Sequence, residues 1–347
     1  MYKKLSILIA IVMLFNIVLT GCASNSPSEP NNDAVNESPD GTKKLKIGSM
    51  FNNPDPANSG GWDISQWAGM KAMEEDYGWE VSIAENVPYP KVNETVMSYI
   101  DKDYDIVIFP DNGMIESWAE LFPKYPDTYF IMVSSTATMP EGAKNTTIYQ
   151  ADQYSYGCLL GIALSKVTKT KKIGLLGGTP IPSVKYQFSG VIEACKAIDP
   201  EIEVLTYFAG DWSDTAKHRE ITQIMINQGV DAIFTMTGVA DKGVYEAAES
   251  GGAKVIGYAS DMHKNSPNTI FTSLLFDFKT LYADMAKAVM DGTIEQKVYP
   301  LGVEYMKYAD FRDSVPEEVE KDIIETAEKF KNGELVIEKV IHEDILK

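Results

Sequence analysis

The sequence predicts an α/β protein of two lobes, each built on a parallel sheet with helices on both faces. Short apolar strands alternate with amphipathic helices from Lys44 onward, and the same alternation starts again after Asp152. Because strand–helix–strand units place their strands parallel in one sheet, two successive series predict two doubly wound sheets. The chain has 347 residues, which is enough for two lobes that each bury a core.

The first series covers residues 44–152. Its segment 104–111, YDIVIFPD, is an almost unbroken apolar run, which is typical of a parallel strand buried on both faces. The expected strands are 44–51, 80–87, 104–111, 128–135 and 145–152, and the expected helices are 65–77, 90–102 and 115–125.

The second series begins with a helix over 153–167, which carries small residues along one face. Asp214 or Ser213 is expected to cap the helix that starts at Thr215. A helix through Met290 follows the last strand of the series, and a final helix over 316–332 is expected to lead into a short strand. The remaining expected strands are 171–178, 203–210, 230–238, 254–261 and 270–277, and the remaining helices are 184–198, 215–228 and 242–250.

The first 21 residues predict a secretory signal peptide. Two lysines precede a long apolar run, and LTGC at 19–22 places small residues before a cysteine. LTGC resembles the lipobox of bacterial lipoproteins, in which the cysteine is lipid-modified, so we expect Cys22 to be a lipidated N-terminus; an uncleaved membrane anchor is the alternative. Residues 22–43 are rich in Ser, Pro, Asn and acids and predict a disordered tether. The body is therefore expected at the extracytoplasmic face of the cell membrane.

The composition argues against a nucleic-acid partner and against catalysis. The 50 acidic residues outnumber 31 Lys and Arg, whereas phosphate backbones are bound by Lys and Arg. The three histidines have no metal-site spacing with the cysteines, and GLLGGTP matches neither phosphate-binding glycine motif. We therefore predict no catalytic residue, metal or cofactor. Cys158 and Cys195 lie in separate helical patterns and are expected to be buried thiols.

Aromatic and acidic residues follow the ends of several expected strands. Ligands of doubly wound sheets bind beyond the carboxyl ends of the strands, which singles out Asp111 and the pair Trp62 and Asp63. Trp212 follows a strand of the second series, within AGDWSD. Two tryptophans at equivalent edges would hold a flat ring between them. In the alternative interpretation Trp62 only packs as a helix staple, while Asp63 or Ser65 caps the helix.

Three stretches carry a family resemblance: GLLGGTPIPSVKYQFSGVIEACKAIDPEIEV, the run from YFAGDWSD to VYEAAE, and VIGYASD. In this order they resemble the basic membrane protein family, the purine-nucleoside-binding lipoproteins of ABC importers, over about residues 45–291. The resemblance implies a type I periplasmic-binding-protein fold, with two Rossmann-like lobes joined by a multi-strand hinge. It also implies that the ligand is trapped between the lobes and that the closed form is presented to a membrane permease.

The resemblance implies roles for several residues. Family members grip a purine between aromatic side chains, with an Asn or Asp at the base edge and an Asp and a Lys at the ribose. By position, Trp62 and Trp212 match the two aromatic residues, and Asp63 matches the usual Asn beside the first. Phe188 lies in the matching GGxPIP-helix motif, and Gly238 lies in the glycine turn.

Three departures from the family pattern affect the expected ligand. Asp63 replaces an amide by a group that only accepts hydrogen bonds when ionised. The DSD motif reads ASD, so Asp261 matches its last acid whereas Ala259 replaces its first. Phe276 stands where many nucleoside binders have a lysine, which removes a donor to ribose hydroxyls. These changes make a free purine base a candidate beside a purine nucleoside.

The predicted protein is a lipid-anchored solute-binding protein of an ABC importer that delivers a purine nucleoside or base to its permease. Lobe 1 is expected to comprise residues 44–151 plus about 258–300, and lobe 2 residues 152–257 plus about 301–347. A binder of sugars or of another small solute is an alternative with the same fold. A surface receptor that senses its ligand is an alternative of a different class.

Overall fold

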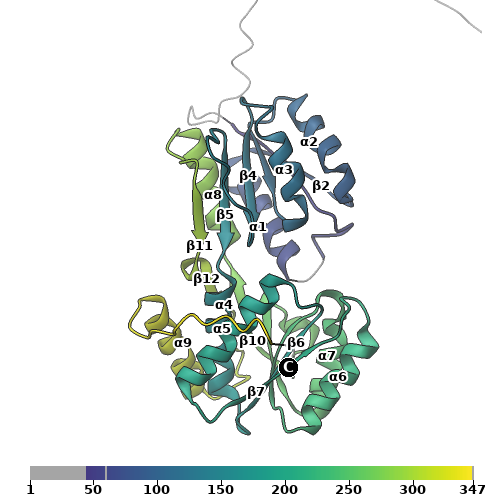
Figure 1. The fold of residues 1–347 in the computed structure, drawn as a ribbon, viewed down its shortest axis with the longest axis vertical. Coiled ribbons are helices and arrows are strands. Elements are labelled where there is room, and N and C mark those ends of the chain that lie inside the picture. Colours follow the sequence, from purple (N-terminus) through teal and green to yellow (C-terminus); the bar gives the residue numbers. More distant parts are fainter. Residues whose placement is uncertain (1–43, 59–60, 346–347) are drawn as a thin grey trace, which may run out of the picture.

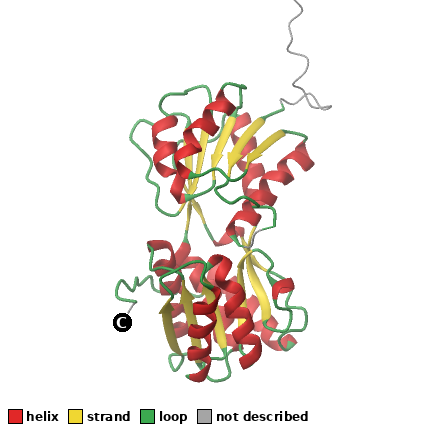
Figure 2. Cartoon of the chain, turned by 90° about the vertical axis from the view of Figure 1, so that its right-hand side faces the viewer, coloured by secondary structure: helices red, strands yellow, loops and turns green. Residues whose placement is uncertain are grey.

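The computed structural model describes residues 44–58 and 61–345. The predicted signal peptide, Cys22 and the predicted tether lie outside the described residues. The described chain forms two lobes joined at a waist (Figures 1 and 2), and each lobe contains one six-stranded sheet flanked by helices. The predicted two-lobe α/β architecture is confirmed.

Lobe 1 carries the sheet β11-β5-β4-β3-β1-β2, in which the neighbouring strands are parallel. Its middle strand β3 is buried along its whole length, as its apolar sequence predicts. The strands are β1 (Lys46–Met50), β2 (Glu80–Ala84), β3 (Ile106–Phe109), β4 (Tyr129–Ser134), β5 (Thr146–Ala151) and β11 (Val298–Leu301). The helices are α1 (Trp62–Tyr77), α2 (Val92–Ile100), α3 (Ile115–Leu121) and α8 (Phe278–Met290), with the short 3-10 helices η2 (Tyr89–Lys91) and η3 (Asn112–Met114).

Lobe 2 carries the sheet β12-β10-β9-β8-β6-β7, in which only the edge strand β12 runs antiparallel to its neighbour among the described strands. Its strands are β6 (Lys172–Gly177), β7 (Glu203–Phe208), β8 (Ala232–Met236), β9 (Lys254–Ala259), β10 (Ile270–Phe276) and β12 (Met306–Tyr308). Its helices are α4 (Gln153–Val167), α5 (Pro182–Ile198), α6 (Thr215–Asn227), α7 (Asp241–Gly251) and α9 (Glu317–Lys331), with the 3-10 helices η4 (Gly238–Ala240), η5 (His263–Asn265) and η6 (Val303–Tyr305), the last between β11 and β12.

The described chain passes between the lobes three times: from β5 into α4, from β10 into α8, and from β11 to β12. The expected multi-strand hinge is therefore present. The expected division differs in one segment, because it assigned residues 258–300 to lobe 1, whereas β10 pairs with β9 and β12 in the sheet of lobe 2. Lobe 1 receives only α8 and β11 from this segment.

The sequence analysis did not predict the two hinge strands β11 and β12, and it predicted one strand that the described chain does not form. β11 contains Pro300, which is tolerated because the strand lies at the edge of its sheet. β12 has only three residues, which is too few to show the alternation of apolar and polar residues that marks a strand. No strand follows α9 in the described chain, where the sequence predicted one; residues 334–345 instead run along α4 and α5 without regular pairing.

The small residues of α4 let it pack closely on α5. A Cβ atom at Gly157 would lie 1.9 Å from the carbonyl oxygen of Gln187, and one at Gly190 would lie 2.0 Å from that of Tyr154. The two backbones therefore touch, and only glycine fits at these positions. This contact fixes α4, whose first residue Gln153 follows the first hinge connection.

Candidate functional site

Two adjoining cavities lie between the lobes, beyond the carboxyl ends of the strands. Their volumes are about 320 and about 490 Å³, in the range of small-molecule sites. Both are lined by residues of both lobes, and they share Trp62, Asp63, Trp212, Met236 and Tyr258. We call these two cavities together the cleft.

Trp62 and Asp63 are the first two residues of α1, and both line the cleft. The indole Nε1 of Trp62 donates to the carbonyl oxygen of Pro110 at 2.9 Å. The rings of Phe276 and Phe278 meet the Trp62 ring edge-on, each with centroids 5.1 Å apart. Trp62 is thus fixed at its polar atom and against the hinge, while it remains partly exposed to the cleft.

Asp63 and Asp111 both come from lobe 1 and line the same cavity. Asp63 accepts a hydrogen bond from Asn53 Nδ2 at 3.0 Å. Burial raises the pKa of Asp63; the hydrogen bond from Asn53 opposes this rise, and the charge of Asp111 adds to it. Asp111 accepts from the backbone N–H of Gly113 at 2.6 Å and from the hydroxyl of Tyr89 at 2.8 Å. Burial and the same two carboxylates raise the pKa of Tyr89 above its usual range, so its hydroxyl stays a donor.

In lobe 2, Trp212 lies on the loop after β7 and covers Gly178. A Cβ atom at Gly178 would lie 2.5 Å from the indole ring, so the glycine is what allows this loop to lie flat on the end of β6. Asp214 accepts from the backbone N–H of Lys217 at 3.0 Å and caps α6, as predicted. Gly238 lines the same cavity and has a φ of 65°, a left-handed conformation that favours glycine.

Asp241 is a cleft residue that sequence analysis missed. It follows the Gly238 turn as the first residue of α7, and its Oδ1 accepts from the hydroxyls of Thr235, at 3.1 Å, and of Thr237. Burial raises the pKa of Asp241 to about 6, against the effect of the two threonine hydroxyls. The sequence feature that could have identified Asp241 is its position, three residues after the glycine that follows strand β8.

Other missed residues come from loops without a distinctive pattern. Tyr89 begins the short 3-10 helix η2, one residue before the helix expected over 90–102, and Asn53 lies in the Pro- and Asn-rich loop after β1. Gln153 accepts a hydrogen bond from Tyr258 at 3.2 Å, so the start of α4 and the end of β9 meet at the cleft. Other lining residues to which the sequence assigned no specific role include Asn112, Val133, Ser134, Ser135, Ile181, Ser183 and Met236.

Phe188 and Phe276 do not line the cleft, although both were expected to bind ligand. Phe188 is fully buried in the core of lobe 2, against Phe208 and Phe234. Phe276 is 8% exposed and lies behind Trp62, packed face to face on Phe278. Its role here is to support the Trp62 ring from the hinge.

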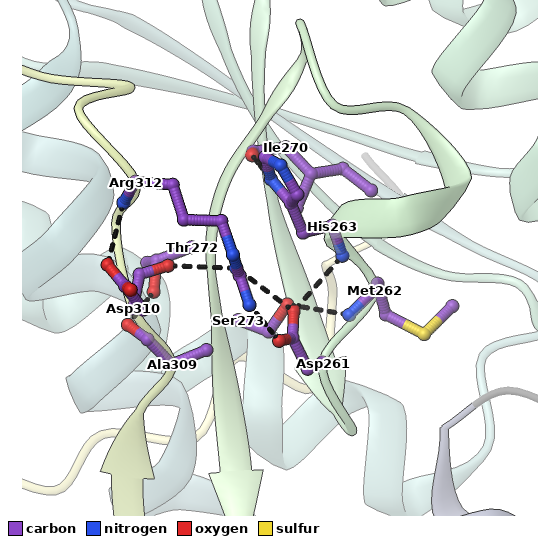
Figure 3. A network of polar contacts seen from close by, with 9 residues as sticks. All are labelled: Asp261, Met262, His263, Ile270, Thr272, Ser273, Ala309, Asp310 and Arg312. Carbon is purple, nitrogen blue, oxygen red and sulfur yellow. Dashed lines mark hydrogen bonds and ion pairs between the residues drawn. The ribbon is translucent and has the colours of Figure 1, made fainter.

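Asp261 is also directed away from the cleft. Its carboxylate forms an ion pair with Arg312 and accepts from the backbone N–H of His263 at 3.2 Å, as Figure 3 shows. Burial alone would raise the pKa of Asp261, but the hydrogen bond and charge of Arg312 hold it below its usual value. Asp261 lines a third cavity, of about 480 Å³, on the hinge side of α1. The structure therefore brings together Trp62, Asp63, Asp111, Trp212 and Gly238 among the expected residues.

The substituted motif position Ala259 joins the lobes through its backbone. It has a φ of 67°, and its carbonyl oxygen accepts a hydrogen bond from the hydroxyl of Ser65 on α1. Next to it, Ser260 Oγ accepts from the backbone N–H of Gly61 at 3.1 Å. The N-terminal turn of α1 is therefore tied to the end of β9 directly beside the cleft.

The described residues contain neither a cluster of His, Cys, Asp and Glu that would hold a metal ion nor a helix long and apolar enough to cross a membrane. The aromatic rings and hydrogen-bonding groups of the cleft are suited to holding a small flat molecule. Cys158 and Cys195 are both buried and unpaired.

Comparison with known proteins identifies relatives along most of the chain. A purine-binding protein of Brucella abortus is 28% identical over 298 residues, which cover 84% of this chain and 83% of that protein. The transcriptional activator protein Med of Bacillus subtilis is 24% identical over 335 residues, which cover 94% of this chain and 98% of that protein. A solute-binding protein of an ABC transporter system from Conexibacter woesei has a similar structure, with a TM-score of 0.74 and 18% identity over 86% of this chain and 100% of that one.

Residues 46–340 match the model of the Bmp family, described as PnrA-like ABC transporter substrate-binding proteins. This match covers the described body from β1 to beyond α9. Together with the two-lobe fold and the cleft, it confirms the resemblance seen in the sequence. The chain belongs to the Bmp family of ABC transporter substrate-binding proteins.

Proposed function

We propose that this substrate-binding protein carries a purine base or purine nucleoside and delivers it to its permease. The observation that carries the proposal is the pair of tryptophans, Trp62 and Trp212, which reach one cleft from opposite lobes. A flat heterocycle between two such rings gains about 1–3 kcal/mol from each stack. The similarity to a purine-binding protein of Brucella abortus supports the same ligand class.

The polar groups of the cleft suit a ring whose edge donates hydrogen bonds. The carboxylates of Asp63 and Asp111 lie at the lobe 1 side of the aromatic pair. Ionised carboxylates only accept, and amino and N–H groups of adenine or guanine only donate. Because the lysine expected beside a ribose is replaced by Phe276, which lies behind Trp62, the free base is favoured over the nucleoside.

We further propose that the protein is held at the extracytoplasmic face of the cell membrane by a lipid on Cys22. This proposal rests on the LTGC sequence and on the polar segment that separates it from β1. A tether of this composition lets the two lobes reach a membrane-embedded permease. Metabolic labelling with an alkyne fatty acid tests it, and a Cys22→Ala variant should lose the label.

Calorimetric titration with purine bases, nucleosides and sugars tests the ligand class. We expect adenine or guanine to bind, adenosine or guanosine to bind with equal or lower affinity, and monosaccharides to give no heat. Mass spectrometry of small molecules that copurify with the protein gives an independent reading. Binding of sugars alone would refute the purine proposal.

A sensory role is a second candidate, and the similarity to Med of Bacillus subtilis over nearly its whole length favours it. A sensor would report occupancy of the cleft to a partner without moving its ligand across the membrane. Deleting the gene and measuring uptake of labelled adenine separates the two roles. Loss of uptake supports transport, whereas unchanged uptake with an altered transcriptional response supports sensing.

A further inference from the structure

The cleft is strongly acidic for its size. Among the described residues that line its two cavities, three are carboxylic acids and none is Lys, Arg or His. Asp63 and Asp111 come from lobe 1, and Asp241 comes from lobe 2. Negative charge therefore faces the space between the lobes from both sides.

These carboxylates receive hydrogen bonds from neutral groups rather than from cations. Asp63 is bonded by an asparagine amide, Asp111 by a backbone N–H and a tyrosine hydroxyl, and Asp241 by two threonine hydroxyls. The charge of Asp111 adds to the rise in the pKa of Asp63, and no Lys, Arg or His is among the described residues that line their shared cavity. By contrast, Asp261, which lies outside the cleft, forms an ion pair with Arg312.

Two features oppose this negative charge but do not cancel it. The helices α1, α4 and α5 direct their N-termini to the cleft, and each contributes about half a positive charge. Asp63 already lies in the first turn of α1, and Asp152 caps α4, so only α5 begins without an acid. His218 acts on Asp241 electrostatically, but it is fully buried and its Nδ1 lies 2.7 Å from the carbonyl oxygen of Asp214.

The aromatic lining adds to the preference for positive charge. The faces of tryptophan and tyrosine rings attract cations, and Trp62, Trp212, Tyr89 and Tyr258 all line the cleft. A flat cation between these rings would satisfy the carboxylates and the ring faces together. A neutral ligand would leave the acids uncompensated in a partly dry site.

We propose that the natural ligand of this cleft is a flat nitrogen heterocycle with a delocalised positive charge, such as a protonated or N-alkylated purine. The inference rests on the proposed function and sharpens it from purines in general to purine cations. The acids then serve as counter-charges for the bound ring, in addition to accepting its hydrogen bonds.

The experiment compares a cationic purine with a neutral molecule of the same shape. The probes are 7,9-dimethyladeninium and 7,9-dimethyl-7-deazaadenine, in which the charged methylated nitrogen is replaced by carbon. Calorimetry of the full-length protein at pH 7 should give at least about tenfold tighter binding for the cation. This preference should shrink at high salt, because salt screens charges that remain partly exposed.

The pH dependence has opposite signs for the two possible roles of the acids. Burial raises the pKa of Asp241 to about 6, so Asp241 loses its proton as the pH rises from 5 to 7, and the pKa of Asp63 is raised by burial in the same direction. Tyr89 and Asp111 face Asp63, and His218 and the hydroxyl of Tyr245 face Asp241. Binding of the permanent cation should therefore tighten over this range, whereas a neutral ligand held by protonated acids would bind more weakly.

Two variants locate the effect, and one serves as a control. Asp63→Asn and Asp111→Asn should each reduce the preference for the cation several-fold, while Asp127→Asn, at an exposed site outside the cleft, should leave it unchanged. Measuring both cleft variants guards against loss of the local fold in one of them.

Each result decides between the proposals. Equal affinity for the two probes, together with binding of adenine or adenosine, would overturn the cationic ligand and leave purine binding intact. If none of the purines binds, the proposed function itself fails and this inference fails with it. A full preference for the cation in both folded cleft variants would also overturn the role given to the acids.

Discussion

Trp212 lies on a loop whose conformation is fixed by acids on either side of it. Asp211 accepts hydrogen bonds from the backbone N–H of Ser213 at 2.7 Å and of Asp214, and these bonds lower its pKa. Asp214 in turn caps α6. The loop therefore keeps its shape without the indole ring, and the ring is preorganised for a ligand.

Trp212→Ala should weaken ligand binding while the fold is retained. The lost stacking corresponds to about 1–3 kcal/mol, which is roughly 5- to 150-fold in affinity. Calorimetry measures the affinity, and thermal unfolding checks the fold. Tyr186→Ala, which removes an exposed aromatic ring outside the cleft, is the matched control and should bind normally. Unchanged affinity in Trp212→Ala would exclude the stacking role.

Asp241 makes stability depend on pH in a predictable direction. Its pKa is raised to about 6 in the folded protein from 3.8, so the folded state takes up a proton more readily than the unfolded state. The contribution of Asp241 to stability is therefore most favourable below pH 4 and declines as the pH rises to 6.

Asp241→Asn should abolish this decline, because an amide keeps an acceptor for the two threonines but does not ionise. The quantity to compare is the free energy of unfolding of the variant minus that of the parent protein. This difference should be about 1–3 kcal/mol larger at pH 7 than at pH 4. Urea unfolding at the two pH values measures it. A pH-independent difference would show that Asp241 ionises freely.

Single residues also show where sequence reasoning succeeds and fails. Position after a strand correctly brought Trp62, Asp63, Asp111 and Trp212 to the cleft, because strand order alone fixes which edge they occupy. Phe188 lies on α5, a helix with one buried and one exposed face, and the GGxPIP-helix motif did not show on which of these faces Phe188 lies. The partner of Asp261 was equally out of reach, since Arg312 is 51 residues away in the chain.

At the scale of elements, the contact between α4 and α5 is the tightest packing that bears on the cleft. Both helices begin at the cleft, with Gln153 and Ser183 among its lining residues. The glycines that bring their backbones together therefore also set how these N-termini are placed. Sequence showed the small residues of α4, but their partner helix follows only from the fold.

Gly157→Ala should destabilise the protein by about 1–3 kcal/mol or more, because the new methyl group would overlap the Gln187 carbonyl. Chemical denaturation measures the loss. Ala197→Ser, on an exposed position of α5, is the control and should stay within about 0.5 kcal/mol of the parent. A neutral effect of Gly157→Ala would mean that the two helices can separate at little cost.

At the scale of the whole molecule, the cleft lies between two lobes that are joined by three hinge connections. A ligand that contacts both lobes stabilises any conformation in which they are closer. Saturation with a bound purine should therefore reduce the radius of gyration measured by small-angle X-ray scattering. Trp212→Ala at the same purine concentration should not contract, and contraction without ligand dependence would argue against hinge closure.

The two lobes and their layers could be predicted from the sequence, because buried parallel strands and amphipathic helices have clearly different patterns of hydrophobic residues. The hinge could not, because β11 and β12 are short and one contains proline. The sequence of a strand does not show which lobe it joins. For this reason β10 was expected in lobe 1, although it pairs in the sheet of lobe 2.

The three crossings also mean that neither lobe is a continuous piece of chain. Lobe 1 takes residues from before α4 and again from α8 to β11, while lobe 2 takes the rest. No single truncation can produce one complete lobe alone, and a protease cut in a loop between any two strands leaves two fragments that share at least one sheet. Nicked protein should therefore stay associated in native gels and separate only in denaturant, and the two halves of this carrier can be gained or lost only together.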